Sequence, residues 1–177
     1  MSPAQGGTSL VVRLTLFAFW LGAGTLFSAI VAPALFDVLP TRTMAGLVVG
    51  RVLPVIFYAG IVVAALDLIV DLRGSRHVGR IATDAVMLLT CAAAQFLIAP
   101  RIERVRAAIP GPIEQLDPTD PQRLEFGRLH AVSVGLLGVA MIAALVAIVS
   151  LTRSMIAARD SRSSSVTSNS LLSTDHA

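Results

Sequence analysis

The residues best suited to chemistry in this chain are arginines and one histidine that lie at the edges of long apolar runs. Arg51 follows Gly50 at the start of one run, and Arg128 follows Gly127 at the start of another, with His130 two residues later. A guanidinium binds carboxylate or phosphate through paired hydrogen bonds, and an imidazole exchanges a proton near neutral pH. These residues predict a polar site for an anion or a polar head group.

The candidate ligand-binding residues share one level, the non-cytoplasmic ends of the apolar runs. They are Arg51, Arg128, His130, Ser133, Gln95 and Ser28. Pro33, Pro54 and Pro100 lie at the same level, and a proline within a helix frees the carbonyl four residues earlier. Freed carbonyls, arginines and an imidazole would line a small polar cavity. In the alternative interpretation the arginines only reach toward lipid head groups and the prolines only bend their helices.

A second polar group lies near the opposite ends of the same runs. Asp67 and Asp71 are four residues apart, and so are Arg80 and Asp84, so each pair occupies one face of its helix. The first interpretation is a cytoplasmic salt-bridge cluster made of these four residues. The alternative is a proton relay through Asp67, which lies deepest, because ionisable groups inside a membrane are often functional.

Composition argues against several other kinds of site. Cys91 is the only cysteine, so an intrachain disulfide cannot form. His77, His130 and His176 are far apart and show no zinc-type spacing, and one histidine among the apolar runs cannot supply two haem ligands without a dimer. The arginines lie at the ends of apolar runs, which suits membrane anchoring. We therefore expect no metal, no cofactor, no enzymatic activity and no nucleic-acid partner.

Four apolar runs must position these residues. The chain has 177 residues, of which 55% are hydrophobic and 14% charged, whereas soluble domains carry about 25% charged residues. The runs cover about 14–38, 48–70, 81–98 and 129–151, and each approaches the roughly 20 residues that a spanning helix needs. An open sheet cannot span lipid, and no barrel-like alternation is present. The sequence therefore predicts an all-α fold, an integral membrane four-helix bundle.

The remaining segments divide around a membrane domain at 14–152. We expect residues 1–13 to form a short N-terminal tail. Residues 153–177 are rich in Ser and lack periodicity, which predicts a disordered C-terminal tail. Apolar residues at helical spacing in 101–109 predict an interfacial segment. Asp120 before Pro121 predicts an N-cap and a first helical position, so the fourth helix begins ahead of its apolar run.

Arginine placement predicts the orientation in the membrane. Each membrane side of the predicted bundle holds seven arginines, so the total number does not decide which side is cytoplasmic. The short connection from Arg73 to Arg80 contains three arginines and no acid, and short loops carry most weight. We expect a multi-pass protein of the inner (plasma) membrane with both termini in the cytoplasm.

The sequence also predicts an internal repeat, in which one helical hairpin occurs twice. "VAPALFDVL" ends the first run and "IAPRIERVR" the third, while "GRVLPVIFYAGIVVAAL" and "GRLHAVSVGLLGVAMIAAL" fill the second and fourth. Two copies with two spans each would be related by a pseudo-twofold axis along the membrane normal. Chance similarity between apolar helices is the alternative.

The chain carries a set of motifs that together resemble a known family. In order, they are "FWLGAGTLF", "VAPALFDVLP", "MAGLVVGRVL", "QFLIAPRIERVR" and "FGRLHAVS". The chain resembles bacterial uncharacterised four-helix membrane proteins related to eukaryotic transmembrane protein 205, from about Phe17 to about Leu151. Leu137 stands where members often carry a polar residue. The resemblance implies a four-helix membrane fold, and the eukaryotic relative's link to platinum-drug resistance and secretory trafficking hints at export or metal handling.

The function that we expect from the sequence is that of an accessory or interaction protein in the envelope or in stress tolerance. Its expected partners are the lipid bilayer and either a second copy or another membrane protein. The alternative is a small transporter or ligand-binding membrane protein with a polar site in the outer leaflet.

Overall fold

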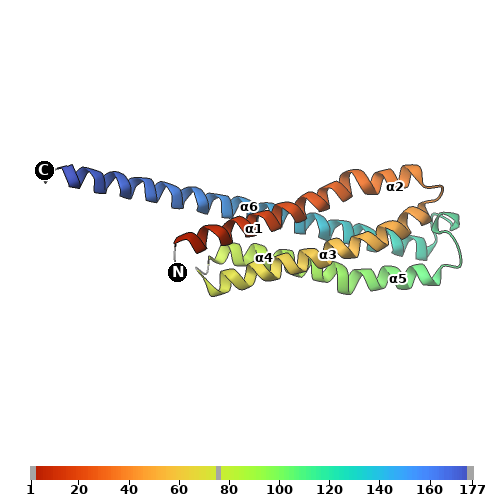
Figure 1. Ribbon diagram of the computed structural model, residues 1–177. Coiled ribbons are helices and arrows are strands. Elements are labelled where there is room, and N and C mark those ends of the chain that lie inside the picture. Colours follow the sequence, from red (N-terminus) through yellow and green to blue (C-terminus); the bar gives the residue numbers. More distant parts are fainter. Residues whose placement is uncertain (1–2, 75–76, 175–177) are drawn as a thin grey trace.

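The structure, a computed structural model, describes residues 3–74 and 77–174, and its long elements are helices (Figure 1). They are α1 (Pro3–Leu26), α2 (Ala32–Val38), α3 (Arg42–Arg73), α4 (Val78–Ala93), α5 (Ala99–Ala108) and α6 (Pro121–Thr174). The π-helical turn η1 (Phe27–Val31) joins α1 to α2, η2 (Ala94–Ile98) joins α4 to α5, and η3 (Ile113–Gln115) is a 3₁₀ turn. The described part of the chain contains no strand, which confirms the predicted all-α class.

Four stretches are long and apolar enough to cross a membrane, as predicted. They are Gly7–Val38, Arg42–Arg73, Val78–Ala108 and Pro121–Ala157, and each contains one predicted run. The segment 101–109, expected to be an interfacial segment, largely continues the helix of the third span, because η2 and α5 follow α4 without a break. Its place at the membrane interface stays a prediction.

The helices also extend into the predicted tails. α1 begins at Pro3 and therefore includes most of residues 1–13, and proline suits the first turn of a helix. α6 continues to Thr174, where the composition predicts a tail without regular structure. No proline or glycine follows Gly138 to end this helix. Arg76, used above to predict the orientation, and residues 175–177 of the predicted tail lie outside the described residues. The predicted domain boundaries stay predictions.

Prolines fall at equivalent places in the two hairpins. Pro33 and Pro100 each follow a π-helical turn, in which the backbone N–H of Ala32 donates to the carbonyl of Phe27 and that of Ala99 to the carbonyl of Ala94. Both turns precede an Ala-Pro pair, at the same 67-residue offset (33 to 100). This agreement supports the predicted duplication, which stays a prediction.

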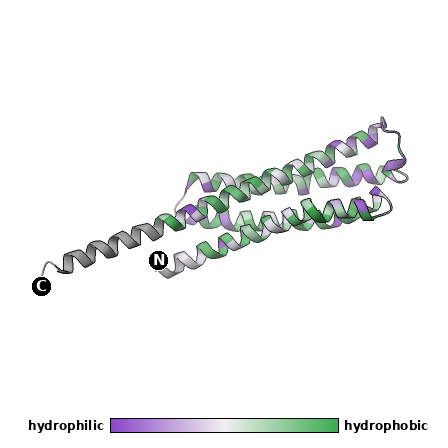
Figure 2. Cartoon of the chain, turned by 90° about the horizontal axis from the view of Figure 1, so that it is seen from above, coloured by the Kyte–Doolittle hydropathy of each residue, from purple (hydrophilic) through white to green (hydrophobic). Residues whose placement is uncertain are grey.

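The four spans pack in a ring, with α1 against α3 and α6, and α4 against α3 and α6. The centre is filled by side chains such as Phe17, Trp20, Phe57, Met87 and Leu151, all 3% exposed or less. Large apolar side chains also cover the outside of the bundle, as expected of a surface that faces lipid. Figure 2 shows hydrophobic residues along the middle of the bundle and hydrophilic residues concentrated at the loop ends.

Candidate functional site

A cavity of about 310 Å³ lies at the end of the bundle where α2 connects to α3, and it is partly open to the surface. Its walls come mainly from α3, α5 and α6. The apolar part of the wall includes Phe36, Val49, Leu53, Phe57, Ile102 and Phe126, and the charged part consists of Arg42, Glu103, Arg106, Glu114 and Arg123. Apolar walls with a few polar groups are typical of ligand pockets.

Arg106, from α5, reaches across the cavity to α3. Its Nη2 donates to the carbonyl of Gly46 and its Nη1 to Oε1 of Glu103, both at 3.4 Å. The guanidinium carbon lies 5.7 Å from the centre of the Phe126 ring, close enough for a cation–π contact. A Cβ at Gly50 would stand 3.2 Å from Nη1. The absence of side chains at these two α3 glycines therefore makes room for the guanidinium.

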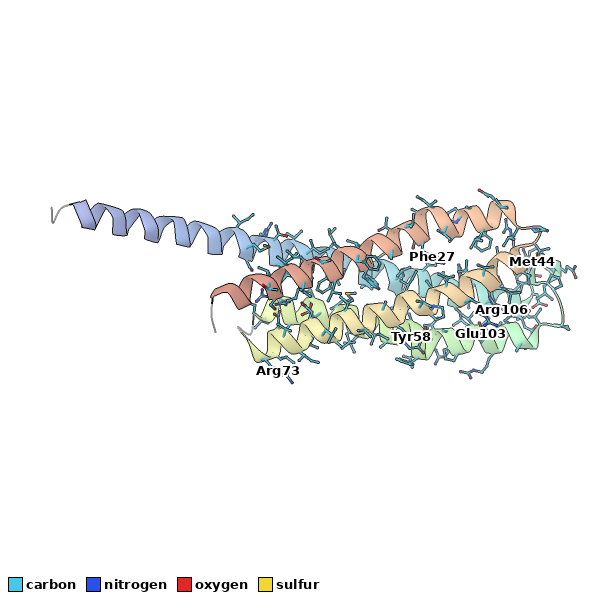
Figure 3. The ribbon with its side chains drawn as sticks, in the orientation of Figure 1. Phe27, Met44, Tyr58, Arg73, Glu103 and Arg106 are labelled. Carbon is cyan, nitrogen blue, oxygen red and sulfur yellow. The ribbon has the colours of Figure 1, made fainter. Side chains whose placement is uncertain are left out.

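The two hydrogen bonds of Arg106 are long, since N–H···O bonds in proteins measure about 2.7–3.2 Å. Guanidinium has five N–H donors, so most of its donor capacity remains for a ligand. Figure 3 shows Glu103 and Arg106 near the end of the bundle marked by Met44, far from Arg73 at the other end.

The connection between α5 and α6 covers this end of the cavity. The Thr43 hydroxyl at the start of α3 donates to Glu114 at 2.6 Å and accepts from the backbone N–H of Ile113 at 3.3 Å. The hydrogen bond from Thr43 lowers the pKa of Glu114, so this carboxylate is ionised at neutral pH. Asp120 accepts from the backbone N–H of Gln122, which confirms the predicted N-cap of α6.

Three of the predicted ligand-binding residues line this cavity. Gln95 and His130 are half-buried and Ser133 is buried. Oε1 of Gln95 has no hydrogen-bond partner among the described residues. The His130 ring lies parallel to Phe126, with 6.3 Å between ring centres. These side chains form the polar part of the inner wall.

The other three predicted residues, Arg51, Arg128 and Ser28, are exposed and do not line the cavity. In both Gly-Arg pairs it is the glycine, Gly50 or Gly127, that lines it. Successive residues on a helix are turned by about 100°, so the arginine beside an inward-facing glycine points elsewhere.

Sequence reasoning missed Arg106 because it occurs in the segment assigned to the membrane interface. The available signal was the Gly46–Gly50 spacing on α3, since small residues four apart allow close approach of another group.

A second polar cluster is buried at the opposite end of the bundle. Arg13 of α1 donates through Nε and Nη2 to both carboxylate oxygens of Asp67 and through Nη2 to Oδ1 of Asp71, the last at 2.6 Å. Arg80 of α4 lies 3.2 Å from the other oxygen of Asp71. The predicted salt-bridge cluster therefore exists, but its central cation is Arg13, which the sequence reading did not include.

Asp84 is the least expected member of this cluster. It was predicted to pair with Arg80 four residues earlier, but Arg80 forms an ion pair with Asp71. Asp84 is completely buried, and neither of its carboxylate oxygens accepts a hydrogen bond from the described residues. Carboxylate oxygens of Asp67, Asp71 and Asp84 lie within 4.8 Å of one another. We name this group of five residues, Arg13, Asp67, Asp71, Arg80 and Asp84, the ion cluster.

Comparison with known proteins places the chain among relatives without an assigned activity. The family model described as "Domain of unknown function (DUF4149)" matches residues 15–110. An "Uncharacterized protein" of Aquifex aeolicus (strain VF5) is 35% identical over 98 residues, which cover 54% of this chain and 70% of that protein. No solved structure matches. The family match includes Arg106 and the three aspartates of the ion cluster, and the chain belongs to the DUF4149 family of proteins.

Proposed function

We propose that this protein binds the anionic head group of a lipid or lipid-like amphiphile in the cavity between α3, α5 and α6. One observation carries the proposal: Arg106 presents a weakly engaged guanidinium above apolar walls. A phosphate or carboxylate would pair with the guanidinium, and an acyl or other apolar body would contact the walls.

The charges around the cavity favour an anion. Three arginines and two glutamates line it, a balance of 3 − 2 = +1. Glu114 accepts from Thr43. Glu103 forms a 3.4 Å ion pair with Arg106, but its side chain is 62% exposed, so water screens this pair and leaves most of the guanidinium charge for a ligand. The volume, about 310 Å³, is at the lower end of the roughly 300–1,000 Å³ of ligand pockets. It suits a head group and the adjoining part of an apolar chain.

Replacing Arg106 by Ala is expected to weaken binding of dihexanoyl phosphatidic acid about 10- to 150-fold. Hydrogen bonds to charged groups contribute about 1.5–3 kcal/mol, and each 1.4 kcal/mol is a factor of ten. The affinity would be measured by isothermal titration of the full chain in detergent micelles, with wild type and variant in parallel.

Arg51→Ala is the matched control, because Arg51 is exposed outside the cavity and should leave the affinity unchanged. Equal losses in both variants would refute the cavity assignment. Dihexanoyl phosphatidylcholine and inorganic phosphate separate the ligand classes. Phosphate binding as tightly as phosphatidic acid would identify a free anion, and the neutral lipid binding equally well would exclude charge recognition.

The orientation belongs to the same proposal. We place both termini in the cytoplasm and the cavity toward the outer leaflet of the inner membrane, which is supported by the three arginines of the 73–80 connection. A fluorescent-protein fusion at the C-terminus should fluoresce in cells, whereas an alkaline phosphatase fusion there should be inactive. The reverse pattern would overturn the orientation.

The accessory role and the absence of enzymatic activity remain expectations from the sequence, as does the relation to transmembrane protein 205. Crosslinking in membranes tests the accessory role, because a specific partner or a second copy should be recovered.

A further inference from the structure

The ion cluster carries unequal numbers of positive and negative side chains between three of the membrane spans. Arg13 and Arg80 bring two positive charges, and Asp67, Asp71 and Asp84 bring three carboxylates, a balance of 2 − 3 = −1. An uncompensated charge in a low-dielectric interior is costly. The cluster therefore requires one more positive charge.

Asp84 is where that charge is missing. The guanidinium of Arg13 bonds to Asp67 and Asp71, and Arg80 lies against Asp71. Asp84 is 0% exposed, and both of its oxygens lack a hydrogen-bond donor in the described part of the chain. It is therefore an unpartnered buried carboxyl within 4.8 Å of carboxylate oxygens that are already paired.

We propose that Asp84 is an exchangeable proton-binding site, in which one proton lies between Asp84 and the neighbouring aspartate carboxylates. A proton needs only one donor oxygen and one acceptor oxygen, and acceptor oxygens of Asp67 and Asp71 lie within 4.8 Å of an Asp84 oxygen. A metal cation needs several oxygen ligands. Both oxygens of Asp67 accept from Arg13, and most backbone carbonyls around the cluster are engaged within the helices α3 and α4, so a metal would find few free ligands. A carboxylate oxygen that accepts one hydrogen bond keeps a lone pair that can still take a proton.

The elements around Asp84 supply no other counter-charge among the described side chains. From α1 comes Arg13, from α3 come the two aspartates, and from α4 comes Arg80. The other titratable side chain buried on α4 is Cys91, two turns along the helix. The buried residues of α6 toward this end are Ala144, Ala147 and Leu151, and its Arg153 is exposed.

A separate cavity with mainly apolar walls lies beside the ion cluster. A space of about 260 Å³ between α1 and α3 is lined by both Arg13 and Asp67, and it also contacts Thr8 and Ser9 nearer the N-terminus. Water entering there would reach the edge of the ion cluster, and the proton could pass through Asp67 to Asp84. Asp67, which the sequence suggested as a proton relay, would then take up the proton first and pass it to Asp84.

Infrared difference spectroscopy of the full chain in lipid nanodiscs tests the proposal. At neutral pH the wild-type protein should show the C=O stretch of one protonated carboxyl, shifted on transfer to D₂O, although exposed aspartates titrate near 3.9. Asp84→Asn should remove this band with little change in thermal midpoint, because the amide resembles a neutral carboxyl in size. Asp37→Asn, which changes an exposed aspartate, should leave the band intact.

Two results would overturn the assignment. One is the absence of a protonated-carboxyl band in the wild-type protein, which needs no variant to fold. The other is a band that survives Asp84→Asn. A rise in the wild-type thermal midpoint with NaCl but not with choline chloride, without such a band, would assign the site to Na⁺ instead. The cavity proposal is independent of these outcomes, since no residue is shared between the two sites.

Discussion

Replacing Arg13 by Met is expected to lower the free energy of unfolding by about 3–5 kcal/mol. Removing one partner of a buried ion pair leaves the other charge uncompensated, and this costs far more than the pair contributes when intact. Arg13 is 11% exposed and bonds to Asp67 and Asp71, which are 4% and 2% exposed. Reversible unfolding of the detergent-solubilised protein by added sodium dodecyl sulfate measures the effect.

Arg73→Met is the control for this experiment. Arg73 is an exposed arginine at the same end of the bundle (Figure 3), and its replacement should change stability by no more than about 0.5 kcal/mol. The double variant Arg13→Met with Asp67→Asn should recover part of the loss, because it also removes one uncompensated carboxylate. Equal stability of the two single variants would show that the ion cluster does not hold α1 against α3.

The Trp20→Ala variant should lose about 3 kcal/mol of stability. Trp20 is 3% exposed, and its Nε1 donates to the carbonyl of Ile56 at 2.8 Å. A Cβ at Gly60 would stand 2.9 Å from Nε1, so the indole fits against a helix surface that lacks a side chain there. Truncating buried Trp costs about 3–5 kcal/mol in soluble proteins. The lower end applies here because lipid is as apolar as the core, and the loss is mainly of packing.

Phe19→Ala provides the comparison, since Phe19 lies one residue away and is 79% exposed toward lipid. It should be nearly neutral in the same unfolding measurement. Trp20→Phe should retain much of the packing and lose about 0.5–1.5 kcal/mol for the hydrogen bond. If Trp20→Ala were no more destabilising than Phe19→Ala, α1 would not depend on this contact with α3.

The helical spans were predictable because the length of an apolar run depends only on consecutive residues. The run at 48–70 identified the second span, and α3 extends it to Arg42 and Arg73. The boundary at Asp120 and Pro121 was also readable, because capping involves residues only two positions apart. The continuity of α4, η2 and α5 could not be predicted from the sequence, because Pro100 looks like a helix boundary unless a π-helical turn accommodates it.

The candidate site was only partly predictable. Gln95, His130 and Ser133 line the cavity, because their level along the spans follows from counting residues. Arg51 was placed at the correct level but points away from the cavity. Helix rotation depends on which face packs against neighbours, and α3 is apolar on nearly all sides, so its sequence carries little information on facing.

The sequence by itself determined a membrane protein with four helices, a cysteine-poor composition and two levels rich in polar residues, because lipid demands apolar spans whatever their neighbours are. Only the tertiary structure decided which charges meet. Arg13 lies 54 residues from Asp67 in the chain, and Arg106 lies 60 residues from Gly46. Contacts at such separations depend on how the helices are rotated and packed in the ring, and this is set by the whole bundle.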